Sequence, residues 1–175
     1  MEVAHLNELI ELEETYWWHV AKRRLVVELL RRYVPPPGRL LEGGVGSARN
    51  LQEFQSMGYE VIGMDVMPAA VDHGKNRGID RIVLGDLAAD WVLEPKSLRA
   101  VVLLDVLEHI ADPVAVLRSA KRCLSEDGAL IFTVPAYQWL MGKWDQRLGH
   151  FRRYNRRMLV EQAAQAELKV VRLSH

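Results

Sequence analysis

Four acidic residues occupy equivalent places along the chain, each closing a short apolar run and each followed by a turn: Glu42, Asp65, Asp86 and Asp105. Apolar runs of this length predict buried strands, and connection rules place the carboxyl ends of parallel strands along one edge of a sheet. Carboxylates crowded on one edge repel each other unless a ligand with hydrogen-bond donors and positive charge lies among them. Any one of them could instead cap a helix, but four in register predict a ligand site.

A glycine-rich turn follows the first of these acids, in the pattern Glu42-x-Gly44-x-Gly46-x-Ala48. Residues without Cβ allow a sharp turn and a close approach of backbone to ligand. A dinucleotide fingerprint, G-x-G-x-x-G, would need a third glycine where Arg49 stands. A carboxylate aimed at the turn suits a ligand with ammonium and sulfonium charges and would repel a pyrophosphate.

This pattern resembles the first motif of class I S-adenosylmethionine-dependent methyltransferases, with Glu in place of the commoner Asp and Ala in place of the commoner last Gly. The resemblance implies S-adenosyl-L-methionine as cofactor and S-adenosyl-L-homocysteine as product. Asp65, about twenty residues beyond the glycines, is placed to accept hydrogen bonds from both ribose hydroxyls. Val66 faces either the adenine ring or the core. The resemblance also implies that Asp86 bonds the exocyclic amine of adenine and that Leu87 supplies a backbone donor.

Two histidines are candidates for the chemistry of the acceptor. The run from Asp105 to Pro113, DVLEHIADP, resembles the segment beside the methyl group in methyltransferases that act on quinones, sterols and related small molecules. His109 would orient an acceptor, take its proton, or only brace the turn. The run 148–154, LGHFRRY, resembles a signature of methyltransferases of glycan, lipid and natural-product assembly. There His150 is a candidate base, and the neighbouring arginines either hold an anionic group or begin a solvated helix.

The elements that must position these residues alternate between strand and helix, which predicts a doubly wound, mostly parallel α/β sheet. Six strands are expected, the last at 168–173. The methyltransferase sheet ordinarily has a seventh, antiparallel strand, and none follows here. We therefore expect a truncated chain, direct pairing of the last strand with the fifth, or a second chain filling the gap, as in a homodimer.

Two segments outside the expected sheet complete the domain. Residues 5–34 have helical spacing with a break near Thr15, and the resemblance places this helical region over the cofactor pocket. We expect Trp17 and Trp18 to pack the helix onto the domain, and Tyr16, His19 or Arg23 to reach the methionine carboxylate. A solvated face is expected for most of the basic residues of the helix, which are Lys22, Arg23, Arg24, Arg31 and Arg32. The long irregular stretch 135–157 predicts a lid or substrate loop.

Composition restricts the function classes. The 175 residues fit one domain, and 23 Lys plus Arg balance 23 Asp plus Glu, so no global basic field recruits nucleic acid or an anionic membrane. No signal peptide, membrane span or metal-ligand spacing is evident. The one cysteine, Cys123, is expected in the core, and a cytoplasmic address is the default.

These observations predict a helical cap over residues 1–38 and an S-adenosylmethionine-binding α/β domain over 39–175. The expected function is methyl transfer from S-adenosylmethionine to a small-molecule or lipid- or glycan-linked acceptor that carries an anionic group. One alternative is a non-catalytic subunit that keeps the adenosyl pocket. The other, an NAD-dependent oxidoreductase, is disfavoured by Glu42 and by Arg49.

Overall fold

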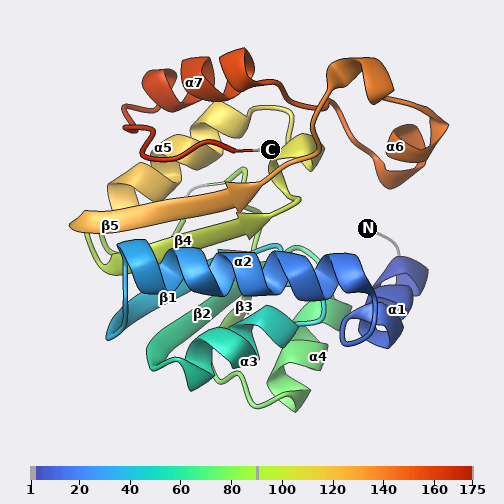
Figure 1. Cartoon of the computed structure of the whole chain (residues 1–175). Coiled ribbons are helices and arrows are strands. Elements are labelled where there is room, and N and C mark those ends of the chain that lie inside the picture. Colours follow the sequence, from blue (N-terminus) through green and yellow to red (C-terminus); the bar gives the residue numbers. More distant parts are fainter. Residues whose placement is uncertain (1–2, 90, 175) are drawn as a thin grey trace.

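A parallel sheet forms the centre of the molecule, as the computed structural model shows for residues 3–89 and 91–174 (Figure 1). Its five strands lie in the order β3-β2-β1-β4-β5, and all neighbours pair in parallel. The order reverses between β1 and β4, which is where doubly wound sheets open a ligand crevice. The strand bounds are β1 Gly38–Gly43, β2 Tyr59–Asp65, β3 Ile82–Leu84, β4 Leu98–Leu104 and β5 Leu124–Thr133.

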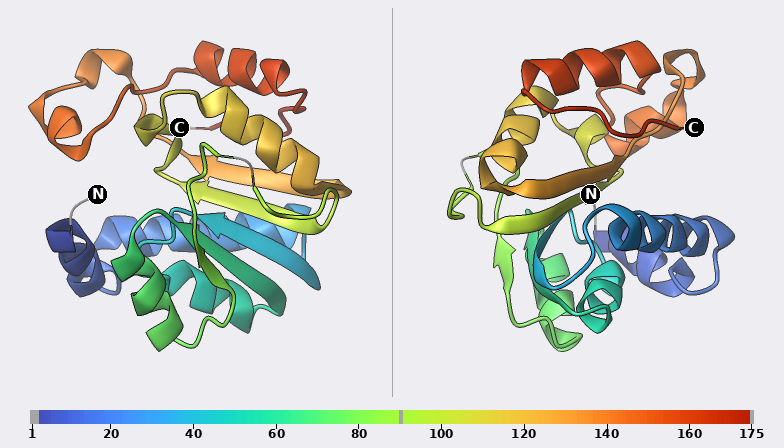
Figure 2. Two further views of the ribbon diagram at one scale, coloured as in Figure 1. Left: turned by 180° about the vertical axis from the view of Figure 1, so that it is seen from behind. Right: turned by 60° about the vertical axis from the view of Figure 1, so that its left-hand side comes forward.

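Helices cover both faces of the sheet (Figure 2). Alternate residues of β4 point to opposite cores: Val102 joins the cluster of α2, α3 and α4, whereas Val101 joins the cluster of α5. This two-sided burial explains why β4 reads as a continuous apolar run. The helices are α1 Val3–Leu12, α2 Trp17–Tyr33, α3 Arg49–Ser56, α4 Pro68–Asn76, α5 Pro113–Cys123 and α7 Arg156–Gln165.

Several helix boundaries agree with the sequence. The break near Thr15 separates α1 from α2. Asp112 caps α5, with Pro113 at its first position, and Asn155 caps α7 by accepting a hydrogen bond from the Met158 amide at 2.9 Å. Cys123 is fully buried, as expected. None of the helices in the described stretches is both long and apolar enough to cross a membrane.

The prediction of a sixth strand at residues 168–173 is wrong. Residues 168–173 pair with no strand in the described chain, and Val170 and Val171 are exposed. The apolar residues of this segment, with two adjacent valines, favour a strand, but a strand also needs a neighbouring strand with which to pair. Instead the segment leaves α7 and passes beside α5 (Figure 2). The edge of β5 is thus unpaired in the described sheet, and a homodimer through an uncovered edge stays a prediction.

The fifth strand begins earlier than the sequence suggests. Gly128 looks like a helix stop, yet it lies inside β5, which starts at Leu124. A Cβ at Gly128 would come within 2.9 Å of the Leu98 carbonyl oxygen, so this glycine permits the close approach of β5 to β4.

The segment 135–157, which we call the lid, projects beyond the carboxyl ends of the strands (Figure 1). It contains a short 3-10 helix, η2 (Gln138–Leu140), and α6 (Lys143–Leu148). Its base is fixed to the sheet side by Tyr154, whose buried hydroxyl donates to the Leu107 carbonyl at 3.1 Å. The Phe151 amide also donates to the Glu108 carbonyl at 2.8 Å.

Candidate functional site

A large cleft opens at the carboxyl ends of the strands, between the lid and the α1–α2 segment. The structure brings together in its lining all four carboxylates expected on one sheet edge, which we call the acidic edge: Glu42, Asp65, Asp86 and Asp105. Because β1, β2 and β4 run in parallel, their ends deliver these side chains to one place.

The glycine turn lies at the floor of this cleft. Gly44 and Gly46 both adopt positive φ, +71° and +50°. A Cβ at Gly44 would approach Val106 Cγ2 to 2.6 Å, so a side chain there meets both backbone strain and a clash. The Gly46 amide donates to Asp65 Oδ2 at 3.1 Å, which ties the turn to the end of β2.

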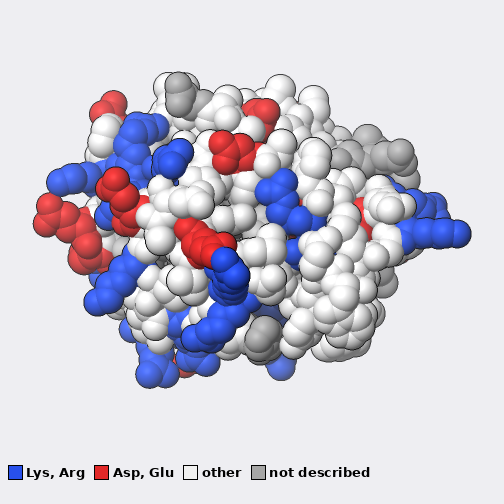
Figure 3. Space-filling model, turned by 90° about the horizontal axis from the view of Figure 1, so that it is seen from above, with Lys and Arg blue, Asp and Glu red and all other residues white. Residues whose placement is uncertain are grey.

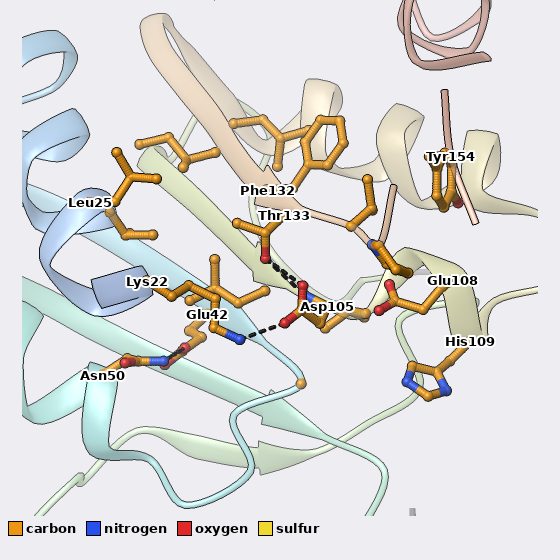
Figure 4. A pocket seen from close by; sticks show the side chains of 18 of the residues that line it. Lys22, Leu25, Glu42, Asn50, Asp105, Glu108, His109, Phe132, Thr133 and Tyr154 are labelled. Atoms are coloured by element: carbon orange, nitrogen blue, oxygen red, sulfur yellow. Dashed lines mark hydrogen bonds and ion pairs between the residues drawn. The ribbon is translucent and has the colours of Figure 1, made fainter. Parts of the chain in front are cut away.

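Glu42 is buried, and its two carboxyl oxygens differ in their hydrogen bonding (Figure 4). Its Oε1 accepts a hydrogen bond from Asn50 Nδ2 at 2.9 Å, while its Oε2 has no hydrogen-bond partner among the described residues. Burial raises the pKa of Glu42 to about 8, with the Asn50 hydrogen bond opposing that shift. A buried, unpartnered carboxyl oxygen at a ligand cleft is suited to accept a bond from a cationic or donating group. Asn50 was not anticipated, because its role depends on where α3 begins.

Asp105 forms an ion pair with Lys22 of α2, a helix whose basic residues were mostly expected to face solvent. Lys22 Nζ lies 2.5 Å from Asp105 Oδ2, and only 14% of the Lys22 side chain is exposed. Thr133 Oγ1 donates to Asp105 Oδ1 at 2.8 Å (Figure 4). Lys22 is therefore an exception among the basic residues of α2, since Arg24, Arg31 and Arg32 are exposed, as expected for most of them. Helical spacing gives the face of α2 on which Lys22 lies, but not that this face reaches the acidic edge.

Both carboxylate oxygens of Asp65 accept hydrogen bonds from backbone amides. Besides the bond from Gly46, its Oδ1 accepts from the Met67 amide at 2.9 Å. Asp86 is exposed at the cleft and accepts from the Ala88 amide at 2.8 Å. These bonds fix the direction of each carboxylate.

The residues after these two acids differ in burial. Val66 is 59% exposed and lines the cleft, so it does not belong to the core. The Leu87 side chain is buried in the α5-side core, and its backbone lies at the cleft wall.

The aromatic residues in the first turn of α2 are not core residues. Trp17 and Trp18 are 66% and 47% exposed, so the expected packing is wrong. The buried face of α2 is formed further along by Val26 and Leu30, and its first turn lies beyond the body of the sheet. Large rings are often buried, but only where an element packs against another.

The three N-terminal residues expected to reach the methionine carboxylate, Tyr16, His19 and Arg23, have different surroundings. Tyr16 and His19 line the cleft. Arg23 also lines the cleft, but it is buried, and its guanidinium donates to the Glu13 carbonyl at 3.2 Å and to the Glu14 carboxylate at 3.1 Å.

The two candidate histidines come together although they lie far apart in the sequence. The rings of His109 and His150 are perpendicular, with centroids 4.6 Å apart, and both line the cleft. Burial and the neighbouring His150 lower the pKa of His109. His150 Nδ1 lies 3.0 Å from Asp145 Oδ1, which leaves its Nε2 free to face an acceptor.

Asp145 is a site residue that sequence reasoning missed. It is 1% exposed and accepts from the Gly142 amide at 2.9 Å and from Arg153 Nε at 2.7 Å, as well as facing His150. These partners, Arg153 first, lower its pKa to about 2. Arg153 is therefore neither solvated nor free to hold an anion. The five-residue spacing from Asp145 to His150 was the available signal.

A second buried carboxyl stands beside the histidines. Glu108 is 1% exposed, its Oε2 has no partner, and burial raises its pKa to about 8. In the described residues, ligand atoms of Glu108, His109 and His150 lie within 4.8 Å of one another, so the cluster has a composition that suits a divalent cation. Sequence spacing did not indicate this cluster, because His150 arrives from the lid.

Comparison with known proteins gives the family. The sequence profile of a methyltransferase domain matches residues 17–173. The chain belongs to this methyltransferase domain family. The ubiquinone biosynthesis O-methyltransferase of Xanthomonas campestris pv. campestris is 27% identical over 110 residues, covering 58% of this chain and 45% of that protein. The chain thus spans less than half the length of this curated relative.

Solved structures share the fold. A chain of the complex between the Haloferax volcanii Trm112 methyltransferase activator and a methyltransferase has a TM-score of 0.76 at 19% identity, covering 91% of this chain and 72% of that one. Phosphoethanolamine N-methyltransferase 2 of Haemonchus contortus, in complex with S-adenosyl-L-methionine, has a TM-score of 0.71 at 19% identity, covering 82% and 36%. The resemblance to class I methyltransferases inferred from the glycine turn is confirmed.

Proposed function

We propose that this methyltransferase domain binds S-adenosylmethionine along the acidic edge and transfers its methyl group to a small-molecule or lipid- or glycan-linked acceptor. The observation that carries the proposal is the unpartnered Oε2 of Glu42, buried in the cleft lining beside a turn whose two glycines have positive φ. Both features fit a cationic nucleoside better than a pyrophosphate.

Each residue of the acidic edge would bind a different part of the cofactor. Glu42 and Asp105 would face the charged methionine end, and Asp65 the ribose hydroxyls. Asp86 would take the adenine amine, with the Leu87 backbone as donor and Val66 against the ring. Gly44 and Gly46 would allow the backbone to approach the ligand, because a side chain at either position is strained.

The bound cofactor supplies a methyl group already activated by its sulfonium. The chain's own task is then to align the acceptor atom, exclude water and remove a proton. We propose that His150 Nε2 takes the proton of the acceptor, while Asp145 holds the other ring nitrogen protonated. His109, perpendicular to His150, would orient the acceptor. A hydroxyl acceptor is favoured because the curated relative is an O-methyltransferase.

The experiment is transfer of a labelled methyl group from S-adenosylmethionine into an extract of small molecules and lipids. The proposal expects a labelled product whose yield at limiting S-adenosylmethionine falls about tenfold or more in Asp65→Asn, which lacks the carboxylate that anchors the turn. Donor bound without any labelled product would favour the non-catalytic subunit instead. The NAD-dependent alternative is not favoured, because Arg49 is paired with Glu14 and Glu53 and the glycine that a dinucleotide needs is missing.

A further inference from the structure

The lid exposes several large apolar side chains. Trp139, Trp144 and Phe151 are 78%, 59% and 58% exposed, although large aromatic residues are highly buried on average. Trp139 and Phe151 lie outside the cleft lining, so the proposed transfer of a methyl group does not account for them. A cluster of exposed apolar rings on one short segment indicates an interaction surface.

The same segment is locally basic in a chain without net charge. Its one acid, Asp145, is buried and paired with Arg153. Arg147 lies over the Trp144 ring and Arg152 over the Phe151 ring, each 5.7 Å from the ring centroid. Figure 3 shows Lys and Arg atoms projecting at the end of the molecule that carries the lid. Apart from Arg153, which is paired with Asp145, the basic residues of the lid are Lys143, Arg147, Arg152, Arg156 and Arg157.

This surface frames the mouth of the cleft. Trp144 lines the cleft from the lid, and Tyr16 and Trp18 line it from the N-terminal side. Inside, Leu25 of α2 and Phe132 of β5 face the same space (Figure 4). An apolar passage therefore runs from a rim of aromatic and basic residues toward the acidic edge.

We propose that the lid and the start of α2 at Tyr16–Trp18 dock on an anionic lipid bilayer. These two segments together are called the rim. Exposed aromatic rings insert at the boundary between head groups and acyl chains, and basic side chains are attracted to anionic head groups. A lipid-linked acceptor then enters the cleft directly from the bilayer. Only this last step rests on the proposed function; the docking does not.

A bilayer fits better than a nucleic acid, which aromatic and basic residues also bind. The cleft behind the rim is apolar along β5 and acidic at its end. The apolar side chains that β5 contributes to the lining suit an acyl or prenyl chain, and a nucleic acid carries no such chain.

Co-sedimentation of the whole chain with vesicles tests the docking. Vesicles of phosphatidylcholine with about a third phosphatidylglycerol are expected to bind about tenfold more protein than pure phosphatidylcholine, and added salt should weaken this binding. The double variant Trp139→Ser/Phe151→Ser should lose most of it. Val92→Ser is the matched control, since Val92 is 98% exposed but lies outside the rim, and it should bind as the unmodified chain does.

The docking is overturned if the chain ignores anionic vesicles, if the double variant binds as well as the control, or if single-stranded RNA binds while vesicles do not. Titration with S-adenosylhomocysteine separates this proposal from the proposed function. The double variant should keep its affinity for that nucleoside, because neither ring lines the cleft. Vesicle binding without any nucleoside binding would overturn the proposed function and leave the docking intact.

Discussion

Glu42 carries a proton at neutral pH because its carboxyl is buried with one oxygen unpartnered. Its pKa in the folded chain is raised from 4.5 to about 8. Between these two values the folded chain binds more protons than the unfolded chain, so this group makes stability fall as pH rises through that window. A bound cationic ligand lowers the pKa of Glu42, because it stabilises the charged carboxylate.

Binding of S-adenosylmethionine at pH 7 is therefore expected to release a proton from Glu42. Affinity should rise with pH until the pKa of the free site, about 8, is passed. Calorimetry in buffers of different ionisation enthalpy measures the release directly. Glu42→Gln should abolish it, and proton release that persists in this variant would assign the effect to another group.

His150 gives the second prediction at this scale. His150→Ala should slow methyl transfer about a hundredfold, because a positioned base typically contributes at least that factor, while cofactor affinity stays unchanged. Asp145→Asn, which disturbs the orientation of the imidazole, should slow transfer and alter its pH profile. His73→Ala, on α4 and outside the cleft lining, is the matched control. An unchanged rate in His150→Ala removes this residue from the mechanism.

Spacing along the chain was enough to find the acids of the acidic edge, since strand ends can be read from apolar runs. It was not enough to find Lys22, Glu108 and Asp145. These residues belong to the site only because α2 lies across the sheet and the lid folds back on the turn after β4. Contacts between distant segments leave no local pattern.

At the scale of elements, the turn between β1 and α3 depends on a glycine at position 44, where φ is +71°. Gly44→Ala should destabilise the fold by about 1 to 2 kcal/mol for the positive φ and by roughly 1 to 3 kcal/mol more for the clash with Val106. Gly78→Ala is the control, because Gly78 also has positive φ, +82°, but a Cβ there meets nothing within 4 Å. Denaturant unfolding of both variants measures the difference; equal losses would mean that the turn has room for a side chain.

The elements were predicted well where caps and buried runs defined them, as at Asp112 and Asn155. They were predicted poorly where a partner decides the outcome. The segment 168–173 has the β-branched and apolar residues of a strand but pairs with no strand in the described chain, and Gly128 marks a close approach of two strands and not a helix end. Local propensity describes what a segment favours, while tertiary contact decides what it forms.

At the scale of the molecule, the doubly wound arrangement follows from the alternation of strands and helices, and the crevice follows from the reversal of strand order between β1 and β4. The α1–α2 segment and the lid close the two sides of this crevice. What the whole molecule adds is a cleft with an acidic end, an apolar wall and an aromatic, basic mouth.

The most direct test of the central claim is calorimetric titration of the chain with S-adenosylmethionine, S-adenosylhomocysteine and NAD. The account predicts saturable binding of the first two, no binding of NAD, and a weakening of about tenfold or more in Asp65→Asn, since loss of a buried charged hydrogen-bond partner costs about 1.5 to 3 kcal/mol. Binding of NAD in preference to either nucleoside, or equal affinities in the variant, would contradict it.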